Sequence, residues 1–574
     1  MKMKLRKPFA AFVALCMVLP LAACSQAEQG SGSSGNTDGS SATAGEKISF
    51  PLKDPVEFTV FVKNDDATIS YTDNWVTDWV QEETNVKLNF IEAGGEEAET
   101  KLNLIMTGGD SLPDFFLATG WSKAQTMMYA SEQMIIPLNQ YLKEAENWNR
   151  LNEESPMRES DLIFPDGNYY SYGFDNEAFH MNYQAKIWYY KPWLDELNGG
   201  KIPTTTDEFY EYLKKVKESD PNGNGKADEI PLSGHIQGGS GSDPLTFITN
   251  AFLENNNQIA GATVTPGRGF IVNDGKIEFQ LSKPEYKDAL TYLNKLNKEG
   301  LLDPQAFTQA KDDWKALFLQ DVNTVAVATN YNYPCGFDAT KDGAWTNWVA
   351  GNPLKGPDGV QLSAYYADNY FHRGMGIVSA DCERPDVAVA LMDWLASDEN
   401  SLMQTNGPKG LLWDTTDSGT SVDGGTAAWT ALKPETVDEN GNPDLSSEGI
   451  KQKYYRWSID GGIIAATNRL RLSMKVEDPE IDLETHLYNI SKEYEKYAPD
   501  LDTIVPSFAY TEDESKTVAD TSVAVMTYAN QSTVDFITGV MSLDKDWDGY
   551  VSKLDDLGLQ TYIDLMQKKY DEIK

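Results

Sequence analysis

The chain is short of basic residues and of histidine, and each shortage narrows the classes of protein to which it can belong. Lys and Arg together number 48 against 88 Asp and Glu, which gives a formal net charge of −40. So acidic a surface cannot neutralise phosphate groups, so nucleic acid is excluded as a partner, as is charge-driven adhesion to anionic lipid. Four histidines scattered over 574 residues are too few for a histidine metal cage.

Cysteine and long apolar runs are equally scarce. Cys16 and Cys24 lie in or just after an N-terminal apolar run, so only Cys335 and Cys382 remain for a disulfide, and the sequence leaves that pairing open. The apolar run, residues 8–21, is shorter than the roughly 20 residues that a membrane span needs. The sequence also lacks the G-x-S-x-G, H-E-x-x-H and G-x-x-x-x-G-K motifs, and we assign no catalytic residue.

The N-terminus has the pattern of an export signal. The basic start MKMKLRK, the short apolar run and small residues before Cys24 predict a signal peptide over 1–23. Leu21-Ala22-Ala23-Cys24 resembles a bacterial lipobox, although an ordinary signal peptide with a chance cysteine is the alternative. We therefore expect a lipidated Cys24 and a flexible Ser/Gly tether over 24–49, with the protein anchored by lipid to the extracellular face of the cell membrane.

Strand and helix patterns alternate from residue 50 onward. The β-rich segment 56–62 is followed by a helical pattern over 74–83, a second strand over 86–92, a helix over 97–107 and a third strand over 114–118. Similar signals recur at 187–190 and 324–329. Alternation of this kind predicts an α/β protein with mainly parallel sheets and right-handed crossovers.

Several segments resemble one known family. They are GGDSLPDFFLATGW (108–121), IWYYKPWLDEL with the following segment to 232, WKALFLQDVNTVAVATNY (314–331) and the tail 536–574. Together with the lipobox they resemble the extracellular solute-binding lipoproteins of sugar-importing ABC transporters in Gram-positive bacteria. The resemblance implies a two-lobe, periplasmic-binding-protein-like fold of type II, with a hinge and lobes that are discontinuous in sequence. We place the first lobe at 50–174 and 324–400, and the second at 175–323 and 401–574.

Residues 220–229, DPNGNGKADE, have the ligand spacing of a calcium loop. Oxygen-bearing side chains stand at positions one, three, five and nine, and Gly225 stands at position six, where the loop must turn. Position twelve is Pro231 instead of Glu, so Glu229 would have to supply the last carboxylate. The related alginate-binding receptors use such a shortened loop, which supports a structural calcium site, whereas a plain Asn-Gly turn with solvated acids is the alternative. The expected ligands are Asp220, Asn222, Asn224, Lys226 through its carbonyl, Asp228 and Glu229.

The expected ligand residues follow predicted strands or stand in polar segments. Ligands of open α/β sheets bind outside the carboxyl ends of the strands, and sugar rings stack on aromatic side chains. Packing in the core is the alternative role for every aromatic residue among them. The candidates are Asp65, Trp121, Asn330, Tyr331, Tyr333, Trp345, His372 and Trp457.

The resemblance implies a binding protein and not an enzyme. We expect a monomer that captures an extracellular carbohydrate, best matched by an oligosaccharide, and delivers it to ABC permease subunits through lobe closure. Two alternatives remain open from the sequence, a secreted polysaccharide-degrading enzyme and a cell-surface module for another ligand. Hydrolysis of a glycosidic bond needs two neighbouring carboxylates. Such a pair does not identify an enzyme here, because a chain with 88 acidic residues always contains suitable pairs.

Overall fold

The structure is a computed structural model, and its description covers most of residues 47–574. The described part omits residues 65–69, 95–96, 110, 237–240, 258–266, 367–370, 373, 433–435, 438–442, 445–456 and 458–461. The predicted signal peptide, Cys24 and almost all of the tether lie in 1–46, outside the described residues. Among the described helices, none combines the length and apolarity required to cross a bilayer.

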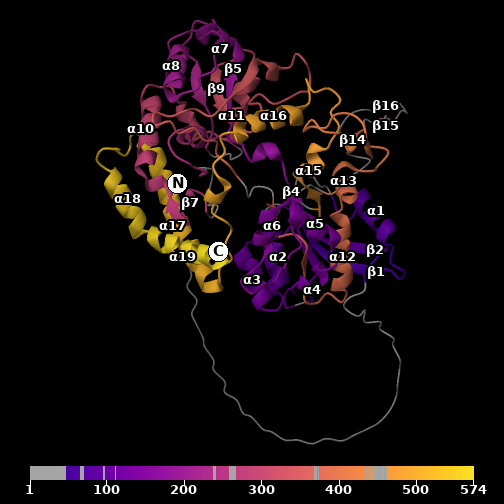
Figure 1. Cartoon of the computed structure of the whole chain (residues 1–574). Helices are drawn as coiled ribbons and strands as arrows, with labels where there is room; N and C mark the ends of the chain where they lie inside the picture. The colour runs from indigo at the N-terminus through magenta and orange to yellow at the C-terminus, as the bar shows by residue number, and fades with distance from the viewer. Residues whose placement is uncertain are drawn as a thin grey trace, which may run out of the picture. The chain divides into compact units, whose positions relative to one another are not determined.

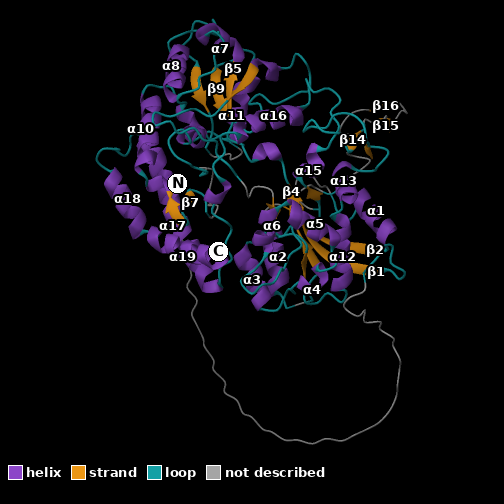
Figure 2. Ribbon diagram, in the orientation of Figure 1, coloured by secondary structure: helices purple, strands orange, loops and turns teal. Residues whose placement is uncertain are grey.

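The first sheet has three parallel strands and one antiparallel edge strand (Figures 1 and 2). It contains β1 (Val56–Asn64), β2 (Val86–Gly94), β3 (Phe115–Leu117) and β12 (Ile377–Val378), in the order β12-β3-β1-β2. Side chains alternate across β1, so that Val60 and Val62 enter one apolar cluster and Phe61 another. Both faces are therefore buried, as expected for a parallel sheet.

Helices cover both faces of this sheet. Val76 and Val80 of α1 and Leu391 of α12 join the cluster on the Val60 side, whereas Leu102 of α2 joins the cluster on the Phe61 side. The helices associated with these clusters are α1 (Trp75–Thr84), α2 (Glu97–Thr107), α3 (Lys123–Ser131), α4 (Asn139–Leu142), α5 (Glu146–Glu154), α6 (Pro156–Leu162) and α12 (Pro385–Leu395). The next helix, α13 (Asp398–Asn406), instead packs through Leu402 in a separate small cluster with Trp413 and Leu470.

The second sheet is mixed. Its strands β5 (Ile187–Tyr190), β6 (Ile230–Ser233), β9 (Val325–Thr329) and β10 (Trp348–Gly351) lie in the order β10-β5-β9-β6. Strands β6 and β9 are parallel, whereas β5 is antiparallel to both of its neighbours. Tyr189 and Trp188 enter different apolar clusters, so this sheet too is buried on both faces.

The remaining elements surround the second sheet or form small hairpins. The helices are α7 (Lys191–Asn198), α8 (Thr206–Lys217), α9 (Pro244–Thr249), α10 (Pro284–Lys298), α11 (Lys311–Ala316), α15 (Asn468–Leu472), α16 (Leu483–Glu495), α17 (Glu512–Thr538), α18 (Trp547–Asp556) and α19 (Leu559–Ile573). The hairpins pair β7 (Phe270–Asn273) with β8 (Lys276–Phe279), β13 (Trp413–Thr415) with β14 (Trp429–Ala431) and β15 (Thr436–Val437) with β16 (Pro443–Asp444). Short 3-10 turns are η1 (Phe179–Met181), η2 (Gln280–Ser282), η3 (Pro304–Phe307), η4 (Leu317–Leu319), η5 (Ala344–Asn347) and η6 (Leu501–Thr503).

A third, short sheet is made of the segments that connect the two larger ones. Its strands are β4 (Phe174–Asn176), β11 (Phe371–His372) and β17 (Ala465–Ala466), in the order β11-β4-β17. Strand β4 leads from the first sheet to β5, and β11 leads from β10 back to β12. Strand β17 leads from residues packed on the first sheet to α15 and α16. The chain thus crosses three times between the sheets, in one hydrogen-bonded layer.

This topology corrects the predicted division of the chain. Strands β9 and β10 pair within the second sheet, although our prediction placed 324–400 in the first lobe. Trp457 and Ile463 pack in the cluster of the first sheet, although the prediction placed 401–574 in the second lobe. The strand at 325–329 was predicted correctly as a strand, but its partners are set by pairing over long distances in sequence.

A buried ion pair connects β4 to α6, one of the helices packed on the first sheet. Arg158 of α6 donates from Nε to Asp175 Oδ2 at 3.0 Å and from Nη2 to the Tyr172 carbonyl at 2.7 Å. Both charged side chains are almost fully buried, at 0% and 2% exposure. Burial raises the pKa of Asp175 in spite of the opposing influence of Arg158. The arginine therefore compensates the charge of a carboxylate that lies in a connecting strand.

We expect Arg158→Ala to lower the free energy of unfolding by about 3–5 kcal/mol, because it leaves Asp175 buried and uncompensated. Urea denaturation followed by circular dichroism measures the loss. Lys87→Ala is the matched control, because Lys87 pairs with Glu57 at an exposed site and its removal should change stability little. Equal losses in the two variants would contradict the structural role assigned to Arg158.

Candidate functional site

A buried lysine organises the edge of the second sheet at which β9 ends. Lys186 is fully buried, and its Nζ donates to the carbonyls of His180 and Tyr183 at 2.7 and 2.6 Å. Its own carbonyl accepts from the Asn330 amide at 2.9 Å. Burial lowers the pKa of Lys186 well below its usual value. The lysine thus fixes the turn η1 beside the carboxyl end of β9.

Six aromatic side chains gather around this turn, and we call them the η1 aromatic cluster. Phe179 lies 5.3 Å from Tyr488 and 5.6 Å from Tyr183, measured between ring centroids. The rings of Tyr183 and Tyr365 are 5.4 Å apart, and those of His180 and Tyr331 are 6.4 Å apart and nearly parallel. His180 and Tyr183 are buried, whereas the other four are half-buried. The members are Phe179, His180, Tyr183, Tyr331, Tyr365 and Tyr488.

Charged groups adjoin this cluster from α15 and α16. His180 Nδ1 lies 3.5 Å from Glu484 Oε2, and Arg471 Nη2 lies 3.7 Å from Glu484 Oε1. Arg471 also donates to the Glu177 carbonyl at 3.1 Å. Burial lowers the pKa of His180 although Glu484 opposes the shift. Burial alone would raise the pKa of Glu484, but His180 and Arg471 bring it below its usual value. The imidazole is therefore held neutral beside an ionised carboxylate.

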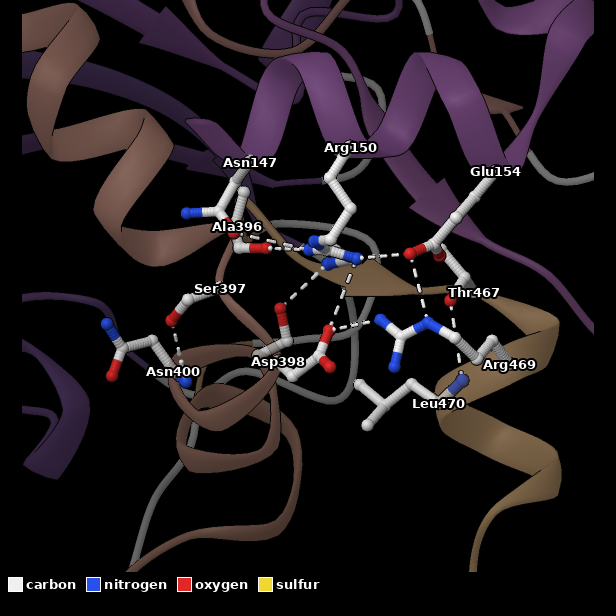
Figure 3. A network of polar contacts seen from close by, with 12 residues as sticks. Asn147, Arg150, Glu154, Ala396, Ser397, Asp398, Asn400, Thr467, Arg469 and Leu470 are labelled. Atoms are coloured by element: carbon white, nitrogen blue, oxygen red, sulfur yellow. Dashed lines mark hydrogen bonds and ion pairs between the residues drawn. The ribbon is translucent and has the colours of Figure 1, made fainter. Parts of the chain in front are cut away.

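A second polar network connects α15 to the helices α5 and α13 (Figure 3). Arg150 Nη1 lies 2.9 Å from Glu154 Oε1 and 3.3 Å from Asp398 Oδ1. Arg469 bonds to the same two carboxylates, at 2.9 Å to Glu154 and 2.7 Å to Asp398. Two arginines and two acids thus alternate in a closed ring that joins α5, α13 and α15. Because Arg471 belongs to the same short helix, α15 contacts charged groups that precede and follow the connecting strand β17.

The first sheet also ends in polar groups. Asn64, the last residue of β1, donates from Nδ2 to Glu92 Oε2 at 2.8 Å. Glu92 Oε1 accepts from the amide and the hydroxyl of Thr72, both at 2.9 Å. The buried Asn64 Oδ1 has no hydrogen-bond partner among the described residues. Carboxylate and amide groups of this kind suit recognition of hydroxyl groups.

Both large sheets therefore present the carboxyl ends of their parallel strands to the connecting segments. Thr119, just after β3, donates its amide to the Gly374 carbonyl at 3.0 Å, next to the entry into β12. On the second sheet, the turn η1 lies between β4 and β5, at the end of β9. Ligands of open α/β sheets bind outside these ends, so the connecting sheet adjoins two candidate binding edges.

Two of the predicted ligand residues lie at this edge. Asn330 is bound through its backbone to Lys186 and to the Trp188 indole, and Tyr331 joins the η1 aromatic cluster. Tyr333 and Trp345 are instead buried, at 6% and 8% exposure. The Tyr333 hydroxyl lies 2.9 Å from His486 Nδ1, and burial raises the pKa of Tyr333 to about 12. Their placement favours the packing role that the sequence left open.

The other predicted residues are buried or not described. Trp121 packs against Phe116 and Tyr129, and Trp457 donates to Thr77 Oγ1 at 3.0 Å from a site of 1% exposure. The polar sequence around Trp457 makes a core role less natural, but the structure buries its side chain. Asp65 and Cys24 lie outside the described residues. His372 has its backbone in β11, and its side chain lies outside the described part.

Sequence reasoning missed most of the η1 aromatic cluster. Phe179, His180 and Tyr183 stand in the connection between β4 and β5, whereas Tyr365 and Tyr488 come from segments far along the chain. The density of aromatic residues over 179–190 was the available signal, and we used it only to predict the strand 187–190.

The predicted calcium loop folds back on its own acidic residues between α8 and β6. Asp220 accepts from the amides of Asn224 and Gly225 at 3.1 and 2.9 Å, and Asp228 accepts from the side-chain amides of Asn222 and Asn224. Gly225 has φ +72°, a conformation that favours glycine.

One carboxylate of this loop has an unsatisfied oxygen. Glu229 is 6% exposed, its Oε1 has no hydrogen-bond partner among the described residues, and burial raises the pKa of its carboxyl group. No group of three or more acid, histidine or cysteine side chains in the described part of the chain is arranged to hold a metal ion. The oxygen-rich donor set and the orphaned Glu229 atom fit a hard cation, although Asp220 and Asp228 now bond to the loop itself.

The two buried sheets, the three crossings and the polar sheet edges define a two-lobe ligand-binding protein of the type II class. The chain belongs to the bacterial extracellular solute-binding protein family, whose sequence pattern matches residues 65–401.

Three known proteins illustrate the similarity. The fructooligosaccharide ABC transporter substrate-binding protein FusA of Streptococcus pneumoniae is 25% identical over 476 residues, which are 80% of each chain. The structure of an EF-hand mutant of FusA in complex with fructo-nystose has a TM-score of 0.67 at 21% identity, covering 90% of this chain and 99% of that one. A human-milk-oligosaccharide-binding solute-binding protein of Bifidobacterium longum infantis has a TM-score of 0.72 at 20% identity, with the same coverages. These structures establish the predicted fold.

His235, two residues after the end of β6, leads to a prediction about stability in acid. Its side chain is buried beside Trp314, with ring centroids 4.9 Å apart, and its Nδ1 has no described partner. Burial, with a smaller effect from Lys311 and Lys315, lowers the pKa of His235 from 6.5 to about 4.

Because the unfolded chain takes up a proton near pH 6.5 and the folded chain does so only near pH 4, stability should fall as the pH drops through this window. We expect the His235→Phe variant to lack this pH-dependent part of the free energy of unfolding. Urea denaturation between pH 8 and pH 4 measures it, with pH 8 as the internal reference. A stability difference between the two proteins that stays constant with pH would contradict the assignment.

Proposed function

We propose that this protein is the extracellular receptor of an ABC importer, which captures an oligosaccharide and delivers it to membrane permease subunits. The observation that carries the proposal is the η1 aromatic cluster at the carboxyl end of β9, beside the segments that connect the two sheets. Membership of the solute-binding family and the similarity to a fructooligosaccharide receptor support it.

Each sheet edge would contribute a different kind of contact. The half-buried rings of Phe179, Tyr331 and Tyr365 suit the apolar C–H faces of a sugar ring. The Asn64–Glu92 pair at the end of the first sheet suits the hydroxyl groups of the sugar, because a carboxylate accepts hydrogen bonds and Asn64 Oδ1 has no partner within the described part of the chain. No covalent step is needed, so the protein binds the glycan unchanged.

The connecting sheet would act as the hinge. Its strands are only two or three residues long, and a few such residues can absorb the backbone rotation of domain closure. The ring of Arg150, Glu154, Asp398 and Arg469 would keep α15 attached to the first group of elements during that rotation. A ligand that contacts both edges would favour the closed state through its differential affinity.

The receptor would work as a monomer held at the outer surface of the cell membrane. Lipidation of Cys24 and the Ser/Gly-rich segment that follows would tether the binding part near the permease. Anchoring by lipid agrees with a chain whose described helices include none suited to span a bilayer.

We expect a bound oligosaccharide to raise the melting temperature, reduce the radius of gyration in solution scattering and remain chemically intact. Thermal shift, small-angle scattering and mass spectrometry of the recovered glycan measure the three effects. Cleavage of the glycan would favour a polysaccharide-degrading enzyme instead. Stabilisation without any compaction would contradict the closure mechanism.

We further propose that the loop Asp220–Glu229 holds a structural calcium ion. Side-chain oxygens of Asp220, Asn222, Asn224, Asp228 and Glu229, with the carbonyl of Lys226, would supply its ligands. The ion would neutralise three neighbouring carboxylates and fix the junction between α8 and β6. The unsatisfied Glu229 Oε1 supports the proposal, as does the existence of an EF-hand in FusA.

Removal of calcium by a chelator should lower the melting temperature of the wild-type protein, because binding to the folded state alone stabilises it. Asp220→Ala should abolish this response. Asp195→Ala, which alters an exposed acid of α7, should leave it intact. Calorimetry with and without chelator makes the comparison, and an equal response in Asp220→Ala would overturn the assignment of the site.

A further inference from the structure

The neighbouring helices α15 and α16 belong to different lobes. Arg469 of α15 bonds at 2.9 Å to Glu154 of α5, a helix packed on the first sheet. In α16, the Tyr494 hydroxyl accepts from the Ile187 amide at 3.0 Å and donates to the Gly351 carbonyl at 2.7 Å, where β5 pairs with β10. Helix α15 is therefore part of the lobe built on the first sheet, and α16 is part of the lobe built on the second.

The chain passes from the first lobe to the second between Val476 and Asp478. The Val476 amide donates to the Thr420 carbonyl at 2.9 Å, in the β13–β14 hairpin that packs with α13. Two residues later, Asp478 Oδ2 lies 3.1 Å from Lys341 Nζ, in the segment between β9 and β10 of the second sheet. The backbone at Glu477 is therefore free to act as the pivot of this crossing, and a contact that spans it resists rotation of the lobes.

An ionic contact spans this pivot. Arg471 Nη2 of α15 lies 3.7 Å from Oε1 of Glu484, which stands in the first turn of α16. The Arg471 guanidinium is positioned from its own side by a hydrogen bond of 3.1 Å to the Glu177 carbonyl, just after β4. Glu484 is positioned from the second lobe, because its Oε2 lies 3.5 Å from His180 Nδ1 in the turn η1. Each partner is thus directed toward the other by its own lobe.

This contact differs from the surface ion pairs of the protein in two respects. Both side chains are half-buried, at 32% and 27% exposure, so solvent screens their attraction less than that of exposed charges. Among the ion pairs between described residues, no other joins an element of the first lobe to an element of the second.

We propose that the contact between Arg471 and Glu484 is an electrostatic latch that holds the two lobes in the arrangement of this structure. The inference rests on the hinge assigned under the proposed function and does not depend on the identity of the ligand. Rotation that moves α16 away from α15 separates the two charges, so leaving this arrangement costs the free energy of the contact. The latch therefore sets how readily the empty receptor changes its lobe arrangement.

The test measures the distance between the lobes in the absence of any ligand. Spin labels are introduced through non-natural amino acids at two exposed positions, Asn103 of α2 in the first lobe and Lys298 of α10 in the second. Double electron–electron resonance gives the distance distribution for the wild type and for Glu484→Gln. Glu480→Gln is the matched control, because Glu480 pairs with Lys341 within the second lobe.

We expect Glu484→Gln to raise the population of distances outside the main wild-type peak about threefold, because glutamine keeps the shape of the side chain and loses its charge. Arg471→Gln should produce the same change. The double variant should add little to either single variant, since both substitutions remove one shared contact. Glu480→Gln should keep the wild-type distribution.

A wild-type distribution in both Glu484→Gln and Arg471→Gln would overturn the latch. An equal change in Glu480→Gln would also overturn it, because the effect would then follow from the loss of any nearby carboxylate. Additive changes in the double variant would show that the two residues act separately, against the proposal. Failure of every glycan to bind would instead overturn the proposed function, and the distances measured without ligand would still decide on the latch.

Discussion

The candidate binding edge depends on one buried lysine. Lys186 has no carboxylate partner among its described contacts, and it instead bonds to two backbone carbonyls of the segment that leaves the connecting strand β4. Burying an ammonium group is unfavourable unless its hydrogen bonds are made, so these bonds constrain the path of the chain. The constraint places His180 beside Tyr331 and Phe179 beside Tyr183 and Tyr488, so the connection between the two sheets carries a group of neighbouring aromatic rings.

The helix α15 has a similar linking role on the other side of the connecting sheet. Its Arg469 belongs to the ion-pair ring with α5 and α13, and its Arg471 reaches Glu177 and Glu484 beside η1. The short helix is therefore in electrostatic contact with the elements before β17 and with those after it.

The sequence predicted the individual strands better than it predicted which strands pair with one another. Strands 56–62, 86–92 and 187–190 were confirmed, because their apolar residues match strands buried on both faces. The family resemblance supplied the two-lobe fold. The lobe boundaries at 324 and 401 were wrong, because β9 pairs with strands that precede it by many residues and no local pattern encodes such a pairing.

The same limit applies to the site. Tyr331 was predicted from its position after a strand, and it does join the cluster. Trp457 was chosen because its neighbours in sequence are polar, yet its indole lies against Tyr71 and Phe90 in the core. Tyr365 and Tyr488 could not be predicted, since only the tertiary path of the chain brings them to η1. The calcium loop could be predicted from the sequence because all of its expected ligands lie within ten consecutive residues.

We propose that one ligand contacts the carboxyl edges of both sheets at once. Hydrogen–deuterium exchange with and without a bound oligosaccharide tests it most directly, because amides at contacted edges exchange more slowly. We expect slower exchange in two separate regions, 70–74 with 92–94 at the first sheet and 179–186 with 330–333 at the second. Protection confined to the edge of a single sheet would contradict it.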